Sequence, residues 1–170
     1  MALEYRTGIG FDVHAFESDQ TNKPLKLCGV EVEYERALAG HSDADVGIHA
    51  IVDAILGALG LGDIGEHFPP DDKQWKDQDS AMFLEFCKDR LESRKALIVN
   101  LDVTLICEAP KLSSYKQSMR ERIAEILHVA YDRVNIKATT TEKLGFTGRG
   151  EGIACQALVS VQCPANGEGG

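Results

Sequence analysis

Residues 97–107 read LIVNLDVTLIC, and they predict a β-strand that is buried on one face. Successive side chains of a strand point to opposite faces of a sheet, so an apolar–polar alternation marks one covered face and one open face. The apolar positions are Leu97, Val99, Leu101, Val103, Leu105 and Cys107, and the other face carries Asn100, Asp102 and Thr104 between Ile98 and Ile106. We therefore expect a sheet with helices packed on one face.

The rest of the chain supplies both strands and helices in a mixed order. The expected elements are strands over 3–12, 133–139 and 152–162, a strand or hairpin over 25–34 around Gly29, and helices over 43–60, 79–93 (entered through Asp79 or Ser80) and 113–128. These elements lack the regular crossovers of a doubly wound parallel sheet. The sequence predicts an α+β fold with one mixed β-sheet.

Length and composition are those of one soluble globular domain, with 170 residues of which 44% are hydrophobic and 26% charged. We expect a single domain over 1–163 and a disordered tail over 164–170. No transmembrane run occurs, and the first twenty residues are too polar for a secretory signal. Five cysteines without a C-x-x-C pair indicate reduced, mostly buried thiols in a cytosol-like compartment.

The net charge of −9 argues against a nucleic-acid partner and against an anionic membrane surface. A small anionic substrate is compatible with this charge where metal ions or a local cluster of lysine and arginine reverse the field.

Asp12 and His14, in GFDVHAF (residues 10–16), occupy alternate positions of an expected strand and so share one face. His49 lies on the expected helix over 43–60. Two histidines and one carboxylate are a common catalytic zinc set, which leaves the fourth position for substrate or water. The plainer alternative is a solvent-facing Asp–His pair and a hydrogen-bonded core histidine.

The helix with His49 begins within HSDADVGIHAIVDAILGALGLGDIG, residues 41–65. Ser42 followed by Asp45 predicts a capping box, with His41 just outside the helix. Asp45, His49 and Asp53 recur at i, i+4 and i+8 and form one polar stripe. We expect Asp45 or Asp53 to orient His49 through its second nitrogen, as metal-bound histidines usually require. Otherwise Asp45 is only a cap partner and Asp53 is solvent-exposed.

A second group of polar residues lies in KATTTEKLGFTGRGEG, residues 137–152. Glu142 follows three threonines and precedes a glycine-rich turn that carries Lys143 and Arg149. Glycines let backbone N–H groups approach phosphates, and a carboxylate beside phosphate oxygens commonly holds Mg²⁺. The alternative is a tight hairpin whose glycines serve only their backbone angles.

The chain lacks the nucleophile motif G-x-S-x-G, and no cysteine lies in an obvious catalytic setting. A covalent mechanism is therefore disfavoured, and metal-assisted phosphoryl chemistry is favoured.

Five motifs, GFDVHAF, HSDADVGIHA, LGDIGEHFP, EAPK and ATTTEKLGFTGRGEGIAC, follow one another at the spacing found in the 2-C-methyl-D-erythritol 2,4-cyclodiphosphate synthase family. The chain resembles this family over residues 6–162. The family converts 4-diphosphocytidyl-2-C-methyl-D-erythritol 2-phosphate to a cyclic diphosphate and CMP, in the non-mevalonate isoprenoid pathway. The resemblance implies this phosphorus–oxygen lyase reaction, in which the substrate's own 2-phosphate attacks the β-phosphorus in line.

The resemblance also implies roles for individual residues. Asp12, His14 and His49 would bind Zn²⁺, and Glu142 would bind Mg²⁺ or Mn²⁺ between the α- and β-phosphates. The implied catalytic residues are His41, Asp63 and Thr140. The implied substrate contacts are His41, Ser42, Asp63 and Gly65 around the methylerythritol phosphate, and in addition Phe146 and Arg149. Around the cytidine they are the segments 107–112, with Pro110 and Lys111, and 138–140, which is Ala138, Thr139 and Thr140.

The family is a homotrimer with active sites between subunits, so the nucleotide half of each site would come from a neighbour. Its central channel, lined near Phe11, Arg149 and Glu151, holds an isoprenoid diphosphate, which implies such a ligand here. Gln156 stands where family members often carry an acid, a departure that concerns the channel rather than catalysis. The implied location is the bacterial cytoplasm, or the plastid stroma after removal of a transit peptide.

Two rival functions are a zinc-dependent phosphodiesterase and a non-enzymatic trimer that carries isoprenoid diphosphates. The first shares the zinc set but has no use for a cytidine pocket, and the second predicts ligand binding without zinc.

Overall fold

A computed structural model describes residues 2–18, 22–69, 71–75 and 78–165 of the chain. A four-stranded sheet runs in the order β1-β6-β4-β5, and its strands are β1 (Leu3–Ala15), β4 (Leu97–Ile106), β5 (Val134–Thr139) and β6 (Gly152–Pro164). β6 is antiparallel to both β1 and β4, whereas β4 and β5 are parallel. The predicted mixed sheet is confirmed.

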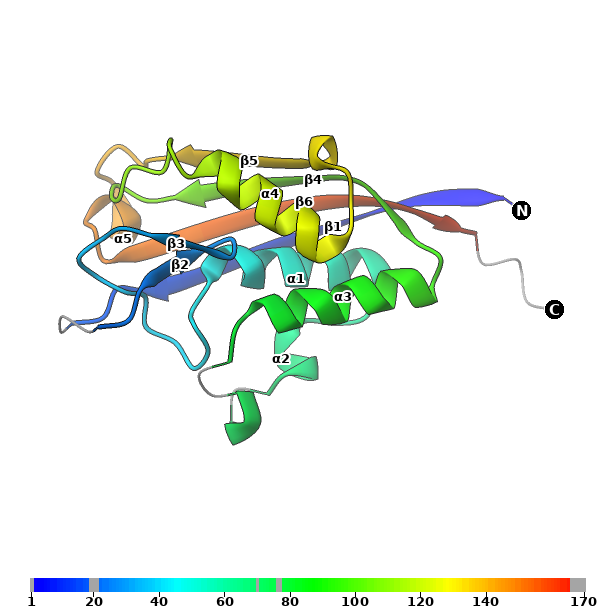
Figure 1. Ribbon diagram of the computed structural model, residues 1–170, viewed down its shortest axis with the longest axis horizontal. Helices are drawn as coiled ribbons and strands as arrows, with labels where there is room; N and C mark the ends of the chain where they lie inside the picture. The colour runs from blue at the N-terminus through cyan, green and yellow to red at the C-terminus, as the bar shows by residue number, and fades with distance from the viewer. Residues whose placement is uncertain (1, 19–21, 70, 76–77, 166–170) are drawn as a thin grey trace.

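Three helices cover one face of this sheet (Figure 1). They are α1 (Val46–Leu59), α3 (Ala81–Ser93) and α4 (Lys116–Leu127). Smaller elements are the hairpin β2 (Leu25–Leu27) and β3 (Val30–Val32), the short helices α2 (Ile64–His67) and α5 (Gly145–Gly148), and the 3₁₀ turns η1 (Lys73–Trp75) and η2 (Tyr131–Arg133). The expected α+β architecture, with helices on one face, is confirmed.

β4 departs from the predicted alternation at its beginning. Leu101 and Val103 face the helices as expected, but Leu97 is 62% exposed and Ile98 is buried. A register shift between Ile98 and Asn100 causes this reversal, because an extra residue in one strand turns the following side chains to the other face. The prediction that Leu97 and Val99 share the buried face of Leu101 is therefore wrong.

β1 lies directly on α1 because two of its inward positions are glycines. A Cβ atom added at Gly10 would lie 1.9 Å from the carbonyl oxygen of Ala50 and 2.8 Å from the amide nitrogen of Ala54. A Cβ atom at Gly8 would lie 1.9 Å from the carbonyl oxygen of Ala54. This close approach brings the end of β1, with Asp12 and His14, against the first turn of α1.

The start of α1 differs from the predicted capping box. Asp45 is the N-cap residue and its carboxylate accepts a hydrogen bond from the Ile48 amide at 3.0 Å, so the helix begins after Asp45 rather than after Ser42. The same carboxylate accepts from the amides of Cys28 at 2.8 Å and Gly29 at 2.6 Å, and burial raises its pKa. Asp45 thus joins the β2–β3 turn to α1.

The sheet face opposite the helices carries apolar side chains that the described residues leave uncovered. Ile9 is 61% exposed, Phe11 58% and Leu158 44%, and Tyr5 and Val13 extend the same face along β1. Phe11 and Val13 point to this uncovered face, whereas Asp12 and His14, the residues next to them in β1, point to the side of the sheet that the helices cover.

Three further predictions concern the cysteines, the membrane and the tail. All five cysteines are free and buried, as expected.

Within the described ranges, no helix combines the length and apolar character that crossing a bilayer requires. Of the predicted tail, residues 166–170 lie outside the described part of the chain, while Pro164 ends β6 and the Ala165 amide donates to the Ala2 carbonyl at 2.9 Å.

Candidate functional site

Asp12, His14 and His49 converge at the end of β1 and the first turn of α1. The Oδ2 atom of Asp12 lies 3.0 Å from His14 Nε2 and 3.2 Å from His49 Nδ1. The two imidazole nitrogens are 3.1 Å apart. Ligands of a tetrahedral zinc ion with bonds of about 2.0–2.1 Å lie about 3.3–3.4 Å from one another, so the spacing of these three atoms fits such an ion.

The tautomer of His14 also fits a metal ligand. Its Nδ1 atom lies 2.6 Å from the carbonyl oxygen of Ala39, which can only accept a hydrogen bond. Nδ1 therefore carries the hydrogen, and in the neutral ring Nε2 has a free lone pair directed at Asp12. Metal-bound histidines generally have this kind of support on the second ring nitrogen.

His49 is supported by serines, and the prediction that Asp45 or Asp53 orients it is wrong. Its Nε2 atom lies 3.0 Å from Ser80 Oγ and 3.2 Å from Ser42 Oγ. Asp45 is occupied as the N-cap of α1, and Asp53 accepts from the Ile64 amide at 2.7 Å. Sequence reasoning missed Ser80, whose only signal was its position at the start of a predicted helix.

The contact between Asp12 and His14 shifts the pKa of both side chains. Burial alone would raise the pKa of Asp12, but the two imidazoles, which donate to its carboxylate in their protonated forms, outweigh burial and hold that pKa well below its usual range. Burial would lower the pKa of His14, but the Asp12 carboxylate outweighs it and raises that pKa. The site therefore stabilises positive charge next to Asp12.

A pocket of about 240 Å³ opens beside these three residues. Its further lining residues are His41, Ser42, Ile64, Gly65, Phe68, Trp75 and Phe83. The predicted residues His41, Ser42 and Gly65 therefore lie beside the three candidate metal ligands. Asp63 is not among the lining residues described; it is the exposed N-cap of α2, and its carboxylate accepts from the Glu66 amide at 3.0 Å.

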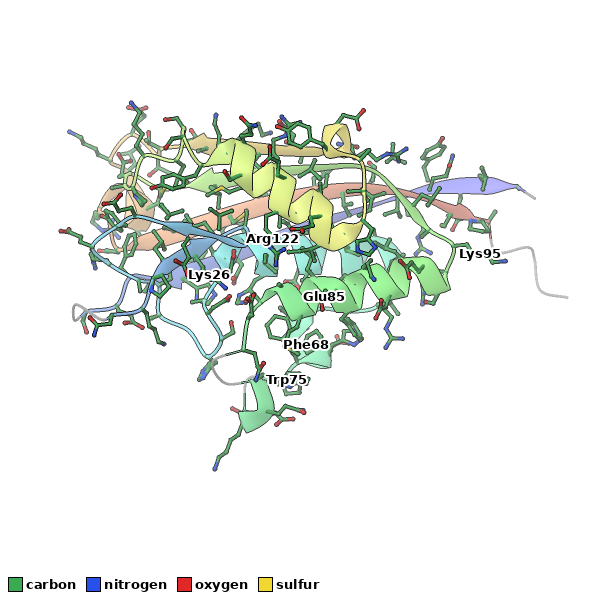
Figure 2. The ribbon with its side chains drawn as sticks, in the orientation of Figure 1. Lys26, Phe68, Trp75, Glu85, Lys95 and Arg122 are labelled. Carbon is green, nitrogen blue, oxygen red and sulfur yellow. The ribbon has the colours of Figure 1, made fainter. Side chains whose placement is uncertain are left out.

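Aromatic side chains form one wall of this pocket and were not predicted. The Phe68 ring lies 4.5 Å from Phe83 and 5.1 Å from Trp75, between centroids. Figure 2 shows Phe68 and Trp75 together below α3, next to α2 and η1. These rings come from separate segments of the chain. Hydrophobic periodicity describes only one helix or strand at a time, so it could not predict contacts between them.

A second pocket, of about 410 Å³, lies where β4 and β5 end. It is lined by Cys107, Glu108, Pro110, Lys111, Leu112, Ser113, Lys116, Ala138, Thr139 and Thr140. Of the segments expected around the cytidine, all of 138–140 and all of 107–112 except Ala109 line this pocket. Ser113 and Lys116 are additional polar lining residues that the sequence reasoning did not name.

The segment over 140–151 connects β5 to β6 and is not a tight hairpin, because β4 lies between these strands in the sheet. Glu142 is exposed, and its Oε1 atom accepts a hydrogen bond from Thr140 Oγ1 at 3.2 Å. Arg149 pairs with Glu151 at 2.8 Å, both exposed. Phe146 and Arg149 are not among the described residues that line the 240 Å³ pocket or the 410 Å³ pocket.

The two pockets lie at opposite edges of the sheet. Asp12 and His14 are on β1, one edge strand, while Thr139 ends β5, the other edge strand. Neighbouring strands are spaced about 4.8 Å apart, so the two edges are separated by roughly 14 Å. Within the described chain, the candidate metal ligands and the second pocket are therefore not brought together.

The chain is similar to known proteins over nearly all of its length. The model of the YgbB family matches residues 5–162. The chain is 56% identical over 163 residues to a bifunctional enzyme IspD/IspF of Gluconobacter oxydans, covering 96% of this chain and 41% of that protein. It is 55% identical over 159 residues to a 2-C-methyl-D-erythritol 2,4-cyclodiphosphate synthase of Cereibacter sphaeroides, covering 94% of this chain and 98% of that protein.

A solved structure of IspF from Plasmodium falciparum in complex with CDP superposes with a TM-score of 0.81 at 33% identity, covering 95% of this chain and 97% of that one. The chain spans about two fifths of the length of the bifunctional relatives that it matches. Since the family model covers nearly all residues and the Cereibacter relative is matched over almost its full length, the chain belongs to the YgbB family, the family of the 2-C-methyl-D-erythritol 2,4-cyclodiphosphate synthases.

Proposed function

We propose that the chain is a cyclodiphosphate synthase of the non-mevalonate isoprenoid pathway. It converts 4-diphosphocytidyl-2-C-methyl-D-erythritol 2-phosphate to 2-C-methyl-D-erythritol 2,4-cyclodiphosphate and releases CMP, as a phosphorus–oxygen lyase. The observation that carries this proposal is the convergence of Asp12, His14 and His49 beside a pocket in a chain of this family. The bacterial relatives support a cytoplasmic rather than a plastid location.

In the proposed reaction an oxygen of the substrate's 2-phosphate forms a bond to the β-phosphorus. The bond from the β-phosphorus to the oxygen that bridges it to the α-phosphate breaks in line, and CMP leaves with that oxygen. No protein nucleophile is needed, because the 2-phosphate is largely dianionic near neutral pH, with a second pKa of about 6.

Two metal sites are part of the proposal. Asp12, His14 and His49 would hold Zn²⁺, and Glu142 would hold Mg²⁺ or Mn²⁺ with Thr140 nearby. When bound, such ions supply Lewis-acid stabilisation of phosphoryl charge, worth several kcal/mol. The two histidines and one carboxylate suit zinc, whereas the single exposed carboxylate of Glu142 suits a hard cation shared with phosphate oxygens.

The protein's own residues then position the substrate. His41, Ser42 and Gly65 line the pocket next to the metal ligands, where the methylerythritol phosphate would lie. Asp63 would hold the diol from the start of α2. Holding the nucleophilic phosphate against its target contributes up to about 7–11 kcal/mol in well-oriented reactions.

The cytidine would occupy the second pocket, of which Pro110, Lys111 and Ala138 to Thr140 form part. Because that pocket and the metal ligands lie at opposite edges of one sheet, one complete site would combine the metal half of one chain with the nucleotide half of another. We therefore include a homotrimer in the proposal. The uncovered apolar face around Ile9, Phe11 and Leu158 supports it, since monomers rarely expose such a patch.

The oligomer part is tested by the substitution Ile9→Glu. A charge on this face would have to be buried without a partner at a subunit interface, so we expect the trimer to dissociate. Sedimentation equilibrium should give the wild-type protein three times the 18.6 kDa mass of the chain and the variant the mass of a monomer. Tyr131→Glu, which places the same charge on an exposed side chain away from this face, should remain trimeric. A monomeric wild-type protein would contradict the proposal.

The reaction is tested by treating the purified protein with a chelator, adding the cytidylyl substrate, and restoring Zn²⁺ and Mg²⁺ separately and together. We expect CMP and the cyclic diphosphate to form only when both ions are restored, measured by phosphorus NMR and chromatography. Hydrolysis to two monophosphates would instead identify a phosphodiesterase. Tight zinc-independent binding of an isoprenoid diphosphate, near Phe11, Arg149 and Glu151, without turnover would identify a carrier.

A further inference from the structure

Ser80 occupies the N-cap position of α3 but does not cap the helix. A serine hydroxyl at this position ordinarily accepts a hydrogen bond from a backbone amide of the first turn. Here no such bond is made. The side chain is completely buried, and its Oγ atom lies 3.0 Å from His49 Nε2 while donating a hydrogen bond to Asp43 Oδ1. Its hydroxyl is thus used for a contact outside its own helix.

The direction of these hydrogen bonds fixes the proton of the imidazole. A carboxylate only accepts, so the single hydrogen of the Ser80 hydroxyl points to Asp43. The lone pairs of Ser80 Oγ are then left for His49, which must donate from Nε2. A neutral imidazole carries one hydrogen, so Nδ1 keeps its lone pair, and Nδ1 is the nitrogen that faces Asp12 and His14.

Asp43 is itself held in place from several directions. Its Oδ1 atom accepts from the Asp45 amide at 3.2 Å, and its Oδ2 atom accepts from the Ser80 amide at 3.1 Å. Lys26 Nζ donates to the same Oδ2 atom at 3.3 Å and to Asp79 Oδ2 at 3.0 Å. Figure 2 shows Lys26 between the β2–β3 hairpin and the start of α3. Because both oxygens of Asp43 accept hydrogen bonds, its carboxylate cannot easily turn away from Ser80.

Ser42 is the competing partner, since its Oγ atom lies 3.2 Å from the same His49 nitrogen. Ser42 Oγ accepts from the Ala44 amide at 3.3 Å. Among the contacts of the described residues, no carboxylate receives the Ser42 hydrogen. Ser42 Oγ also lies 3.4 Å from Ser80 Oγ, and because the Ser80 hydrogen is given to Asp43, the Ser42 hydroxyl is the donor in that contact. This long contact to a neutral oxygen orients the Ser42 hydroxyl less firmly than the Asp43 carboxylate orients Ser80.

We infer that Ser80 is a positioning residue for the metal site, which holds His49 with Nδ1 free to bind the ion, and that Asp43 and Lys26 orient Ser80. This inference rests on the proposed metal site and extends it by a chain of hydrogen bonds from His49 to Lys26. It requires no contact between Ser80 and the substrate.

The test is the substitution Ser80→Ala, followed by titration of the metal-free protein with Zn²⁺ against a chromophoric chelator. We expect zinc affinity to fall 10- to 100-fold, the range typical for loss of a group that orients a metal-bound histidine. Ser93→Ala, which removes an exposed hydroxyl at the other end of α3, should leave the affinity unchanged. Ser42→Ala should weaken zinc binding less than Ser80→Ala. Since Ser80 makes no capping bond, its replacement should leave α3 intact.

A second measurement separates positioning from a general structural role. In the zinc-loaded protein, the His49 Nε2–H proton should give a slowly exchanging NMR signal, and Ser80→Ala should speed its exchange with water. Equal zinc affinity for Ser80→Ala and the wild-type protein, or an unchanged His49 signal, would overturn the inference. Tight zinc binding without cyclodiphosphate formation would contradict only the proposed function, whereas a wild-type protein that binds no zinc would overturn both.

Discussion

Replacement of His49 by alanine is expected to lower the rate of CMP release by at least about a thousandfold. The imidazole is one of three groups whose donor atoms lie within 4.8 Å of one another, and its loss leaves one carboxylate and one histidine. Two ligands hold zinc poorly, so the several kcal/mol of charge stabilisation that the proposed ion would supply would be lost. Each 1.36 kcal/mol of lost stabilisation lowers the rate tenfold.

The measurement is initial-rate release of CMP together with the zinc content of the purified variant. The chain contains a single tryptophan, Trp75, which lines the pocket, so its emission spectrum reports whether the pocket remains folded. His128→Asn is the matched control, because it removes an exposed imidazole from the end of α4, and asparagine tolerates the left-handed backbone there. Persistent turnover by a zinc-free His49→Ala protein would refute the proposed mechanism.

Replacement of Gly10 by alanine is expected to lower the free energy of unfolding by about 3 kcal/mol, the upper end of the range for overpacking. The new methyl group would lie 1.9 Å from a backbone oxygen of α1, and backbone atoms cannot move aside as a side-chain end can. β1 and α1 would have to separate, which also moves Asp12 and His14 away from His49. We expect both a lower midpoint of thermal unfolding and weaker zinc binding.

Gly57, on α1, provides a control substitution that we expect to raise the free energy of unfolding rather than lower it. It is exposed in the interior of α1, and a Cβ atom there would meet only ordinary contacts, the nearest at 3.9 Å. Alanine is better than glycine inside a helix by about 0.8–1 kcal/mol, so Gly57→Ala should stabilise the protein. Calorimetry of both variants checks the pair. Unchanged stability of Gly10→Ala would show that the strand and helix are not packed as described.

Local patterns predicted much of the fold because they reflect burial within single elements. The strands at both ends of the chain and the helices with Met119 or Leu84 in the core lie close to their expected ranges. The exception at Val99 arises from pairing with β6, since a bulge depends on the partner strand as well as on its own residues. The boundaries of α1 likewise depended on Asp45, whose contacts include the distant Cys28 amide.

The convergence of Asp12, His14 and His49 could be predicted, because alternation on one strand places Asp12 and His14 on the same face and His49 lies on the helix expected to pack there. The positions of Ser80 and Phe83 in the site could not be predicted, because these residues reach it only through the packing of α3 against α1. The resemblance to the family implied that the nucleotide half of each site comes from a neighbouring subunit, and within one chain the second pocket lies at the other edge of the sheet from Asp12 and His14.

The distance between the two pockets has a genetic consequence under the proposed trimer. A chain damaged at His49 still carries an intact nucleotide half, and a chain damaged at Lys111 still carries an intact metal half. Trimers that contain both kinds of chain have some subunit interfaces at which an intact metal half meets an intact nucleotide half. Two inactive alleles in one cell would then restore partial growth, while either allele alone would not.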